Sequence, residues 1–391
     1  MSRYDRLDTK LIHAGEPRPR IGGAVTVPIF QTSTFEQDSD TPYDDIRYAR
    51  LSNTPNHDVL HAKLAALEGG EAALVTSSGM AAISTTLLAL LRPGDHLIAQ
   101  RCLYGGTHDL VTKDLADLGI EHSFVDGDDA EQWARALRPT TRAFYCESLT
   151  NPLLEVADLP SIVGFCQSHG LVSVIDNTFT SPVCFRPLEH GFDVVLHSAT
   201  KYLGGHSDVV AGAVIGRSDV VEHVRQKLNH LGACLEPFGC FLLHRGLKTL
   251  ALRVRHQSGT ASTLAHFLSK HEAIATVYHP SLATHPQQAR ARALFDAMGG
   301  VLSFTLKDTS VPVERFIRKL DLPVYAPSLG GVESLITGPA RSSHAGMSAK
   351  AREERGIIDG LIRLSVGLEA ASDLMMDLHQ ALDPSEDERT T

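Results

Sequence analysis

Short apolar runs alternate with stretches of helical periodicity over residues 58–255, and this alternation restricts the fold more than any other feature of the chain. Strands that alternate with helices form mainly parallel sheets that are covered by helices. Seven runs have the length of buried strands. They lie at 73–75, 96–99, 123–125, 143–145, 172–175, 194–196 and 211–215. The sequence therefore predicts an α/β fold with a mainly parallel seven-stranded sheet in a larger domain, residues 58–255.

Two further parts flank this domain. Residues 1–57 contain many Pro, Asp, Thr and Arg residues and show little helical periodicity. Such a segment does not form a core of its own, so we predict an arm that packs on a neighbouring subunit. From residue 256 onward a half-buried strand pattern at 301–306 and a closing helix at 374–382 indicate a smaller C-terminal domain, residues 256–391.

Lys201 lies shortly after the apolar run at 194–196. A lysine at the mouth of a buried strand is costly to desolvate unless it has a partner or a covalent task. The hydroxyl groups of Ser198 and Thr200 flank it. A lysine that forms a Schiff base with pyridoxal 5'-phosphate (PLP) needs an amine of lowered pKa beside hydroxyl groups that bind a phosphate. A surface lysine in a glycine-rich loop would explain this segment alone equally well.

Asp176 ends the apolar run at 172–175. Ligands of open α/β sheets bind beyond the carboxyl ends of the strands. A carboxylate there can hold a pyridinium nitrogen protonated, which makes the ring an electron sink. Alone, an aspartate in such a turn is more often structural. Upstream of Lys201, in this order, it favours a PLP site.

A small-residue turn at 76–80 joins an apolar run to a helical stretch and contains Ser78, Gly79 and Met80. Backbone N–H groups at the start of a helix, together with the helix dipole, suit an anion. The turn contains neither a Walker A motif nor G-x-G-x-x-G, which argues against the usual nucleotide sites. It is therefore a candidate phosphate site.

These segments together resemble the Cys/Met-metabolism (transsulfuration) family of PLP-dependent enzymes, from about Lys10 to about Leu382. The family includes cystathionine γ-lyases, β-lyases and γ-synthases, methionine γ-lyases and O-acylhomoserine sulfhydrylases. The resemblance implies PLP as cofactor and the fold type I architecture of PLP-dependent transferases, with a smaller C-terminal α/β domain. Its most specific matches are the segments 104–107, 147–152, 198–202, 328–334 and 362–367.

The resemblance also implies a role for individual residues. Lys201 would bind the cofactor covalently and then move protons, and Asp176 would pair with the pyridinium nitrogen. Tyr104 would stack on the ring. Arg363 would bind the substrate α-carboxylate, helped by Ser328 and Asn151. The phosphate would be bound by Ser78, Gly79, Met80, Ser198 and Thr200.

Tyr48 and Arg50 resemble the pair with which the family binds the phosphate from a neighbouring subunit. The planar fork of an arginine suits a phosphate dianion. The family often has Asn-Pro-Thr after this arginine, whereas this chain has Asn-Thr-Pro at 53–55. The resemblance implies a homotetramer built from two such dimers.

Within the family we expect a lyase that catalyses γ-elimination on a γ-substituted L-amino acid, similar to a cystathionine γ-lyase. The alternative is a γ-replacement transferase, either a cystathionine γ-synthase or an O-acylhomoserine sulfhydrylase. Enzymes of the family that process cystathionine tend to have acidic residues where this chain has Arg47 and Pro327. We therefore expect weak selection for a distal ammonium group. A non-catalytic scaffold with this fold is the alternative from another class. The joint presence of four residues argues against it: Lys201, Asp176, Tyr104 and Arg363.

Composition excludes several other classes. The formal net charge of −10 argues against nucleic acid as a partner. No apolar run approaches the roughly 20 residues that span a bilayer, and no signal peptide is visible. The six scattered cysteines are typical of reduced thiols, so we expect a cytoplasmic protein. The histidines form no ligand motif, so no metal site is predicted.

Overall fold

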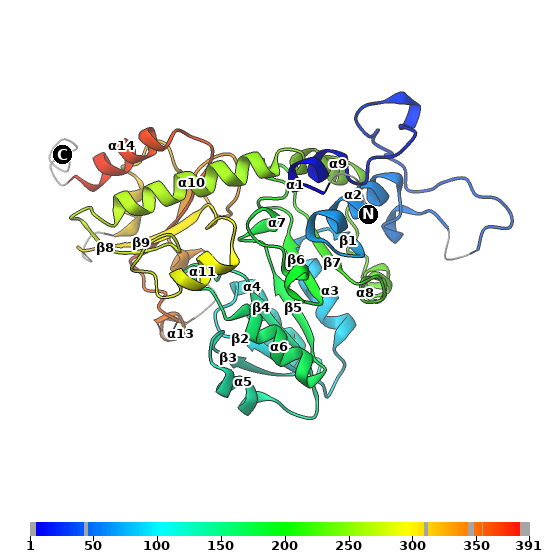
Figure 1. The fold of residues 1–391 in the computed structure, drawn as a ribbon, viewed down its shortest axis with the longest axis horizontal. Helices are drawn as coiled ribbons and strands as arrows, with labels where there is room; N and C mark the ends of the chain where they lie inside the picture. The colour runs from blue at the N-terminus through cyan, green and yellow to red at the C-terminus, as the bar shows by residue number, and fades with distance from the viewer. Residues whose placement is uncertain (1–4, 43–45, 309–311, 343–347, 354, 384–391) are drawn as a thin grey trace.

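The computed structural model describes residues 5–42, 46–308, 312–342, 348–353 and 355–383. Its larger sheet has seven strands in the order β1-β7-β6-β5-β4-β2-β3 (Figure 1). All pairs are parallel except those of β7, which is antiparallel to β1 and to β6. The strands are β1 (Ala72–Thr76), β2 (His96–Gln100), β3 (Glu121–Val125), β4 (Thr141–Glu147), β5 (Val172–Asp176), β6 (Val194–Ser198) and β7 (Gly212–Gly216). The predicted α/β fold with a mainly parallel seven-stranded sheet is confirmed.

Helices cover both faces of this sheet. Adjacent side chains of a strand point to opposite faces, and in the central strands β5 and β6 both sets are mainly apolar and are buried by helices. Val174 packs in the same core as α3 (Gly79–Leu90) and α8 (Ser218–Leu231). Its neighbour Ile175 packs in the core that includes α2 (Pro55–Glu68), α6 (Leu159–His169) and α9 (Pro237–Leu247). Shorter helices connect the strands: α4 (Gly105–Asp109), α5 (Ala130–Ala136) and α7 (Ser181–Cys184).

A second sheet of five strands, in the order β10-β11-β12-β9-β8, forms the C-terminal part. Its core packs against α10 (Leu250–Leu268) and α14 (Ala371–Leu382). The predicted domain boundary after residue 255 falls inside α10, which runs from the larger part of the molecule into the smaller one (Figure 1). The other elements are β8 (Ile274–Tyr278), α11 (Gln288–Leu294), β9 (Val301–Leu306), α12 (Val313–Ile317), β10 (Val324–Tyr325), β11 (Leu335–Thr337), α13 (Ala349–Glu353) and β12 (Leu361–Ser365).

A buried carboxylate helps to fix the N-terminal segment to the larger part, together with the buried Leu11 and the ion pair of Asp8 with Arg255. After α1 (Leu7–His13), an Oε1 atom of Glu16 lies 3.0 Å from Nε2 of His244, 3.3 Å from Nζ of Lys248 and 3.7 Å from Nζ of Lys63. Lys63 belongs to α2 and His244 to α9. Beyond this anchor the chain extends from the body of the molecule (Figure 1).

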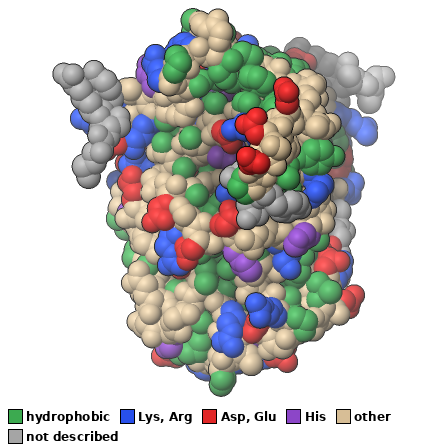
Figure 2. Space-filling view, turned by 90° about the vertical axis from the view of Figure 1, so that its right-hand side faces the viewer, with side chains coloured by type: hydrophobic (Ala, Val, Ile, Leu, Met, Phe, Trp, Pro, Cys, Tyr) green, Lys and Arg blue, Asp and Glu red, His purple; other side chains and the backbone are tan. Residues whose placement is uncertain are grey.

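Basic, acidic and hydrophobic side chains are interspersed on the face drawn in Figure 2. No helix in the described ranges is long and apolar enough to cross a membrane.

Candidate active site

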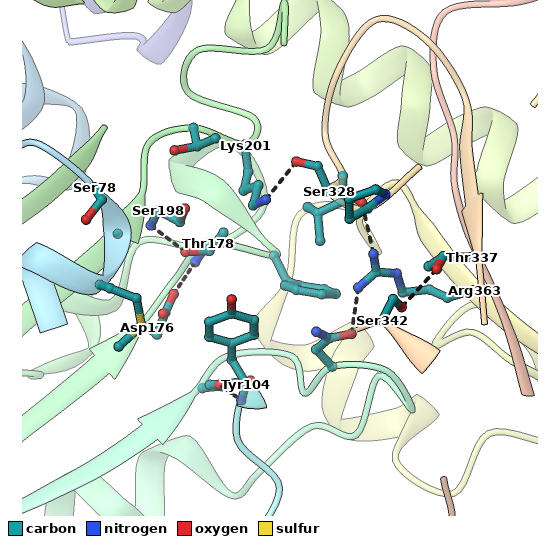
Figure 3. Close-up of a pocket in the computed structure, with 18 of the residues that line it drawn as sticks. Ser78, Tyr104, Asp176, Thr178, Ser198, Lys201, Ser328, Thr337, Ser342 and Arg363 are labelled. Carbon is teal, nitrogen blue, oxygen red and sulfur yellow. Dashed lines mark hydrogen bonds between the residues drawn. The ribbon is translucent and has the colours of Figure 1, made fainter. Parts of the chain in front are cut away.

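A cavity of about 720 Å³ lies between the two sheets. On one side it is lined by residues at the carboxyl ends of parallel strands: Glu147 on β4, Asp176 on β5 and Ser198 on β6. On the other side it is lined by Arg363 on β12 and by Thr337 on β11 (Figure 3). The location agrees with the rule that open α/β sheets bind ligands beyond the carboxyl ends of their strands.

Lys201 lies in this cavity, in the turn that follows β6. Its Nζ atom donates a hydrogen bond of 2.7 Å to Oγ of Ser328 (Figure 3). Burial, and secondarily the nearby Arg363 cation, lower the pKa of Lys201 to about 8. Its amine can therefore lose its proton near neutral pH, as a nucleophile or a base must.

Asp176, which is partly buried, and Glu147, which is buried, form a pair of carboxyl groups at the opposite wall from Arg363. Asp176 accepts a 2.9 Å hydrogen bond from the backbone N–H of Thr178, yet burial raises its pKa. Burial and the neighbouring Asp176 raise the pKa of Glu147 well above its usual range. Glu147 accepts a 2.6 Å hydrogen bond from the backbone N–H of Tyr104. A cation placed against Asp176 would keep its carboxylate ionised.

The turn from β1 to α3 lies against the end of β6. Ser78 caps α3, with its hydroxyl accepting a 3.0 Å bond from the N–H of Ala81. A Cβ atom on Gly79 would lie 2.6 Å from Cβ of Ser198, so only glycine permits this close approach. Ser78, Gly79, Met80 and Ser198 thus line one end of the cavity.

Thr200 also lines the cavity, but its hydroxyl is bonded to the backbone. It donates to the carbonyl oxygen of Ala211 at 3.2 Å and accepts from the N–H of Ala211 at 3.0 Å. The Thr200 hydroxyl proton is therefore already used and is not free to be donated to a phosphate. The hydroxyl of Thr178 instead accepts the N–H of Ser198 at 2.8 Å.

Arg363 is buried without a carboxylate partner among the residues that the structure describes. Its Nη1 atom donates to Oδ1 of Asn151 and its Nη2 atom to the carbonyl oxygen of Ser328, each at 2.9 Å. Within the same described part, its Nε atom has no hydrogen-bond partner. Burial lowers the pKa of Arg363 to about 10. A buried guanidinium with a spare donor suits a carboxylate ligand.

Tyr104 precedes α4 and its side chain is 41% exposed, with its ring at the cavity. A Cβ atom on Gly106 would lie 2.6 Å from Cε1 of Tyr104, so the ring lies directly over this glycine. The position leaves one face of the ring available to a planar ligand.

Tyr48 and Arg50 do not belong to the described lining of this cavity. Nη1 of Arg50 donates to the carbonyl oxygen of Asn229 at 2.8 Å, and its guanidinium lies 5.7 Å from the centre of the Tyr48 ring. Arg47 also points elsewhere, since its Nη2 atom lies 3.0 Å from a carboxylate oxygen of Asp58. One chain therefore does not bring the arm to its own cavity.

Several residues of the cavity had no predicted role. Glu147 lies in the segment 147–152 that carries the family resemblance, and it ends a strand as Asp176 does, which is the signal that could have identified it. Thr178 lies in the turn after Asp176, outside those segments. Arg341 and Ser342 lie on the Arg363 side of the cavity. No sequence pattern marks either of them.

The chemistry of the donor set fits PLP. Lys201 offers an amine of lowered pKa, and Asp176 offers a partly buried carboxylate for a ring nitrogen. The absence of a side chain at Gly79 brings the start of α3 against Ser198, so that the backbone of this turn and the Ser198 hydroxyl lie together at one end of the cavity, as a phosphate site requires. The unpartnered Nε atom of Arg363 fits the carboxylate of an amino acid.

Comparisons with known proteins agree with this chemistry. Residues 8–383 match the family model of the Cys/Met metabolism PLP-dependent enzymes. The chain is 44% identical to a cystathionine beta-lyase of Bacillus subtilis (strain 168), over 98% of both chains. It is 43% identical to a cystathionine gamma-lyase of the same organism, over 96% of this chain and 98% of that one. A solved cystathionine gamma synthase of Xanthomonas oryzae pv. oryzae, in complex with cystathionine, is similar with a TM-score of 0.93 and 40% identity over 99% of each chain.

Proposed function

We propose that this chain, which belongs to the Cys/Met metabolism family of PLP-dependent enzymes, is a lyase that catalyses γ-elimination on a γ-substituted L-amino acid. The named relatives include β-lyases, γ-lyases and γ-synthases. The comparisons therefore show the family, and γ-elimination within it is our proposal, which the reaction products test.

The observation that carries the proposal is that Ser328 connects the amine of Lys201 to the guanidinium of Arg363. Its hydroxyl accepts from Lys201 Nζ at 2.7 Å and its carbonyl accepts from Arg363 at 2.9 Å. Ser328 has a φ angle of 97°, which few residues other than glycine adopt. A strained residue that holds a base near a carboxylate-binding group indicates a preorganised site.

The residues of the cavity would divide the work as follows. When bound, PLP withdraws electrons from the α-carbon of an amino acid. Asp176 would hold the ring nitrogen protonated and Tyr104 would lie against the ring. Arg363 and Asn151 would fix the α-carboxylate.

Lys201 would supply the proton transfers. With a pKa of about 8, its amine can accept a proton from the α-carbon and, once it has passed that proton on and is neutral again, one from the β-carbon. Loss of both protons allows a leaving group on the γ-carbon to depart. The same residues would serve a γ-replacement, in which a thiol then adds instead of water.

The products identify the reaction. We expect cystathionine to give cysteine, ammonia and 2-oxobutyrate, and homocysteine and O-acylated homoserines to give 2-oxobutyrate as well. Pyruvate with homocysteine from cystathionine would show β-elimination and contradict the proposal. A thioether amino acid formed from an added thiol, in place of 2-oxobutyrate, would show γ-replacement. Because Arg47 and Pro327 replace acidic residues, we expect cystathionine to be preferred by less than about 100-fold, the upper end for one charged hydrogen bond.

We further propose that the active unit is at least a dimer, and the whole assembly a homotetramer, in which the arm of one subunit supplies Tyr48 and Arg50 to the cavity of another. The absence of both residues from the described lining of their own cavity motivates this arrangement. The side chains of Val210 and Tyr104 at the cavity are 62% and 41% exposed in the single chain. A partner could cover them.

Mixing two inactive variants tests this arrangement. Arg50→Ala should weaken cofactor retention about tenfold or more, because it removes a charge-assisted bond to a phosphate. A mixture of Arg50→Ala and Lys201→Ala subunits should regain up to about a quarter of the activity, since some cavities then contain both native residues. Mass spectrometry would verify subunit exchange. No recovery despite verified exchange would show that Arg50 acts within its own chain.

A further inference from the structure

We infer that Arg341 selects substrates whose γ-substituent ends in a carboxylate group. The inference rests on the proposed function and extends it to the substrate class. Arg341 ends the short helix Pro339–Arg341, which follows β11. In the pairing of β11 with β12, Thr337 lies opposite Arg363. Arg341 follows four residues after Thr337 and lines the same cavity as Arg363.

A hydrogen-bonded turn holds Arg341 in this place. The hydroxyl of Ser342 accepts from Oγ1 of Thr337 at 2.8 Å and donates to the carbonyl oxygen of Gly338 at 3.0 Å (Figure 3). Thr337 and Ser342 also line the cavity. The backbone that carries Arg341 is thus tied to the strand beside Arg363.

The charges in the cavity are separated. Asp176 lies at the end where the cofactor would bind (Figure 3). Glu147, the other carboxyl group of the described lining, lies beside it in the pairing of β4 with β5. Lys201 and Arg363 already have tasks in the proposed reaction. The other described lining residues between 325 and 342 are neutral: Tyr325, Ala326, Pro327, Ser328, Leu329, Thr337 and Ser342. A distal carboxylate would meet a cation there, whereas a distal ammonium would meet no carboxylate of this lining.

Glu314 on α12 is the competing partner of Arg341. Its Oε1 atom lies 2.7 Å from Nη1 of Arg341, and the two side chains are 24% and 71% exposed. A guanidinium has five donors and can hold two carboxylates at once. The exposed part of Arg341 can therefore take a substrate carboxylate, and Glu314 weakens that attraction by neutralising the charge.

Two esters of homoserine isolate the terminal carboxylate. O-Succinyl-L-homoserine has it and O-acetyl-L-homoserine lacks it, while the α-amino acid and the ester bond are the same. We expect Arg341→Gln to raise the KM for the succinyl ester about tenfold, with kcat changed less than about twofold. Arg341→Lys should restore part of the affinity because it restores the charge. For the acetyl ester all variants should stay within about twofold.

Glu314→Gln is the matched variant, and it should change the KM for the succinyl ester in the opposite direction. It removes the competing carboxylate, so the KM for the succinyl ester should fall, by about two- to threefold. If the ion pair only stabilised the fold, both single variants would weaken binding of both esters alike. That result would overturn the inference, as would an unchanged KM for the succinyl ester in Arg341→Gln.

Binding can also be measured without turnover. In Lys201→Ala protein loaded with PLP, calorimetry should show the succinyl ester bound more tightly than the acetyl ester, and Arg341→Gln should abolish the difference. Equal binding in the presence of Arg341 would contradict the inference whatever reaction the enzyme catalyses. If the binding difference holds but wild type releases no 2-oxobutyrate from either ester, the proposed function fails and the inference stands.

Discussion

Replacement of Lys201 by alanine should lower kcat by at least about 10³-fold, because it removes both the covalent attachment point and the base. The fold should persist. Lys201 lies in a turn at the cavity, and the one described hydrogen bond of its side chain is to Ser328; its backbone hydrogen bonds remain in the variant. The variant should still bind PLP through the other residues of the site, without a covalent bond.

Two measurements check this expectation. Borohydride treatment followed by mass spectrometry should fix the cofactor to wild-type protein and not to the variant, while circular dichroism should be unchanged. Lys307→Ala is the control, since Lys307 is an exposed lysine at the end of β9. A variant that kept wild-type turnover would show that another lysine carries the cofactor.

Replacement of Arg363 by lysine should lower kcat/KM by about 100-fold, mainly through KM, although the positive charge is kept. A lysine cannot reproduce the planar fork that contacts Asn151 and Ser328 at 2.9 Å and leaves one donor for a ligand. The loss corresponds to about 3 kcal/mol, as expected for charge-assisted hydrogen bonds. For amine analogues that lack the α-carboxylate, kcat/KM should be the same in wild type and in Arg363→Lys.

Arg253 offers a matched control. It is as buried as Arg363, and burial lowers the pKa of each to about 10. Its donors bind backbone carbonyl oxygens of Tyr202 and Gly246 rather than line the cavity. Arg253→Lys should lower the melting temperature with little change in KM. Equal KM effects in the two variants would mean that Arg363 acts only on the fold.

Much of the larger sheet was predictable, because parallel strands that are buried on both faces appear as apolar runs. The run predicted at 211–215 is the strand Gly212–Gly216. Its antiparallel direction was not predicted. The chain returns from β6 to β7 through the turn that contains Lys201, without the helical crossover that a parallel neighbour requires. The strands β10 and β11 have only two and three residues, too few for any periodicity.

The candidate site was predictable where a residue type conflicts with its surroundings. Lys201 and Asp176 are charged groups at the ends of apolar runs, and such placement is costly without a task. The roles assigned to them stay predictions. Arg341 could not be identified in this way, because an arginine in a polar segment is ordinary and needs no special explanation. The fold brings it to the cavity that Arg363 also lines, because β11 pairs with β12.

Helix α10 has a consequence for how this chain can change in length. Its 19 residues connect the part that carries Lys201 to the part that carries Arg363. One residue inserted in a helix turns everything after it by about 100° and shifts it by about 1.5 Å. An insertion here would separate the amine from the guanidinium, whereas the same insertion in a surface loop would be absorbed. Descendants of this sequence can thus gain and lose residues in their loops. The length of α10 must stay the same, because it fixes the position of Arg363 relative to Lys201.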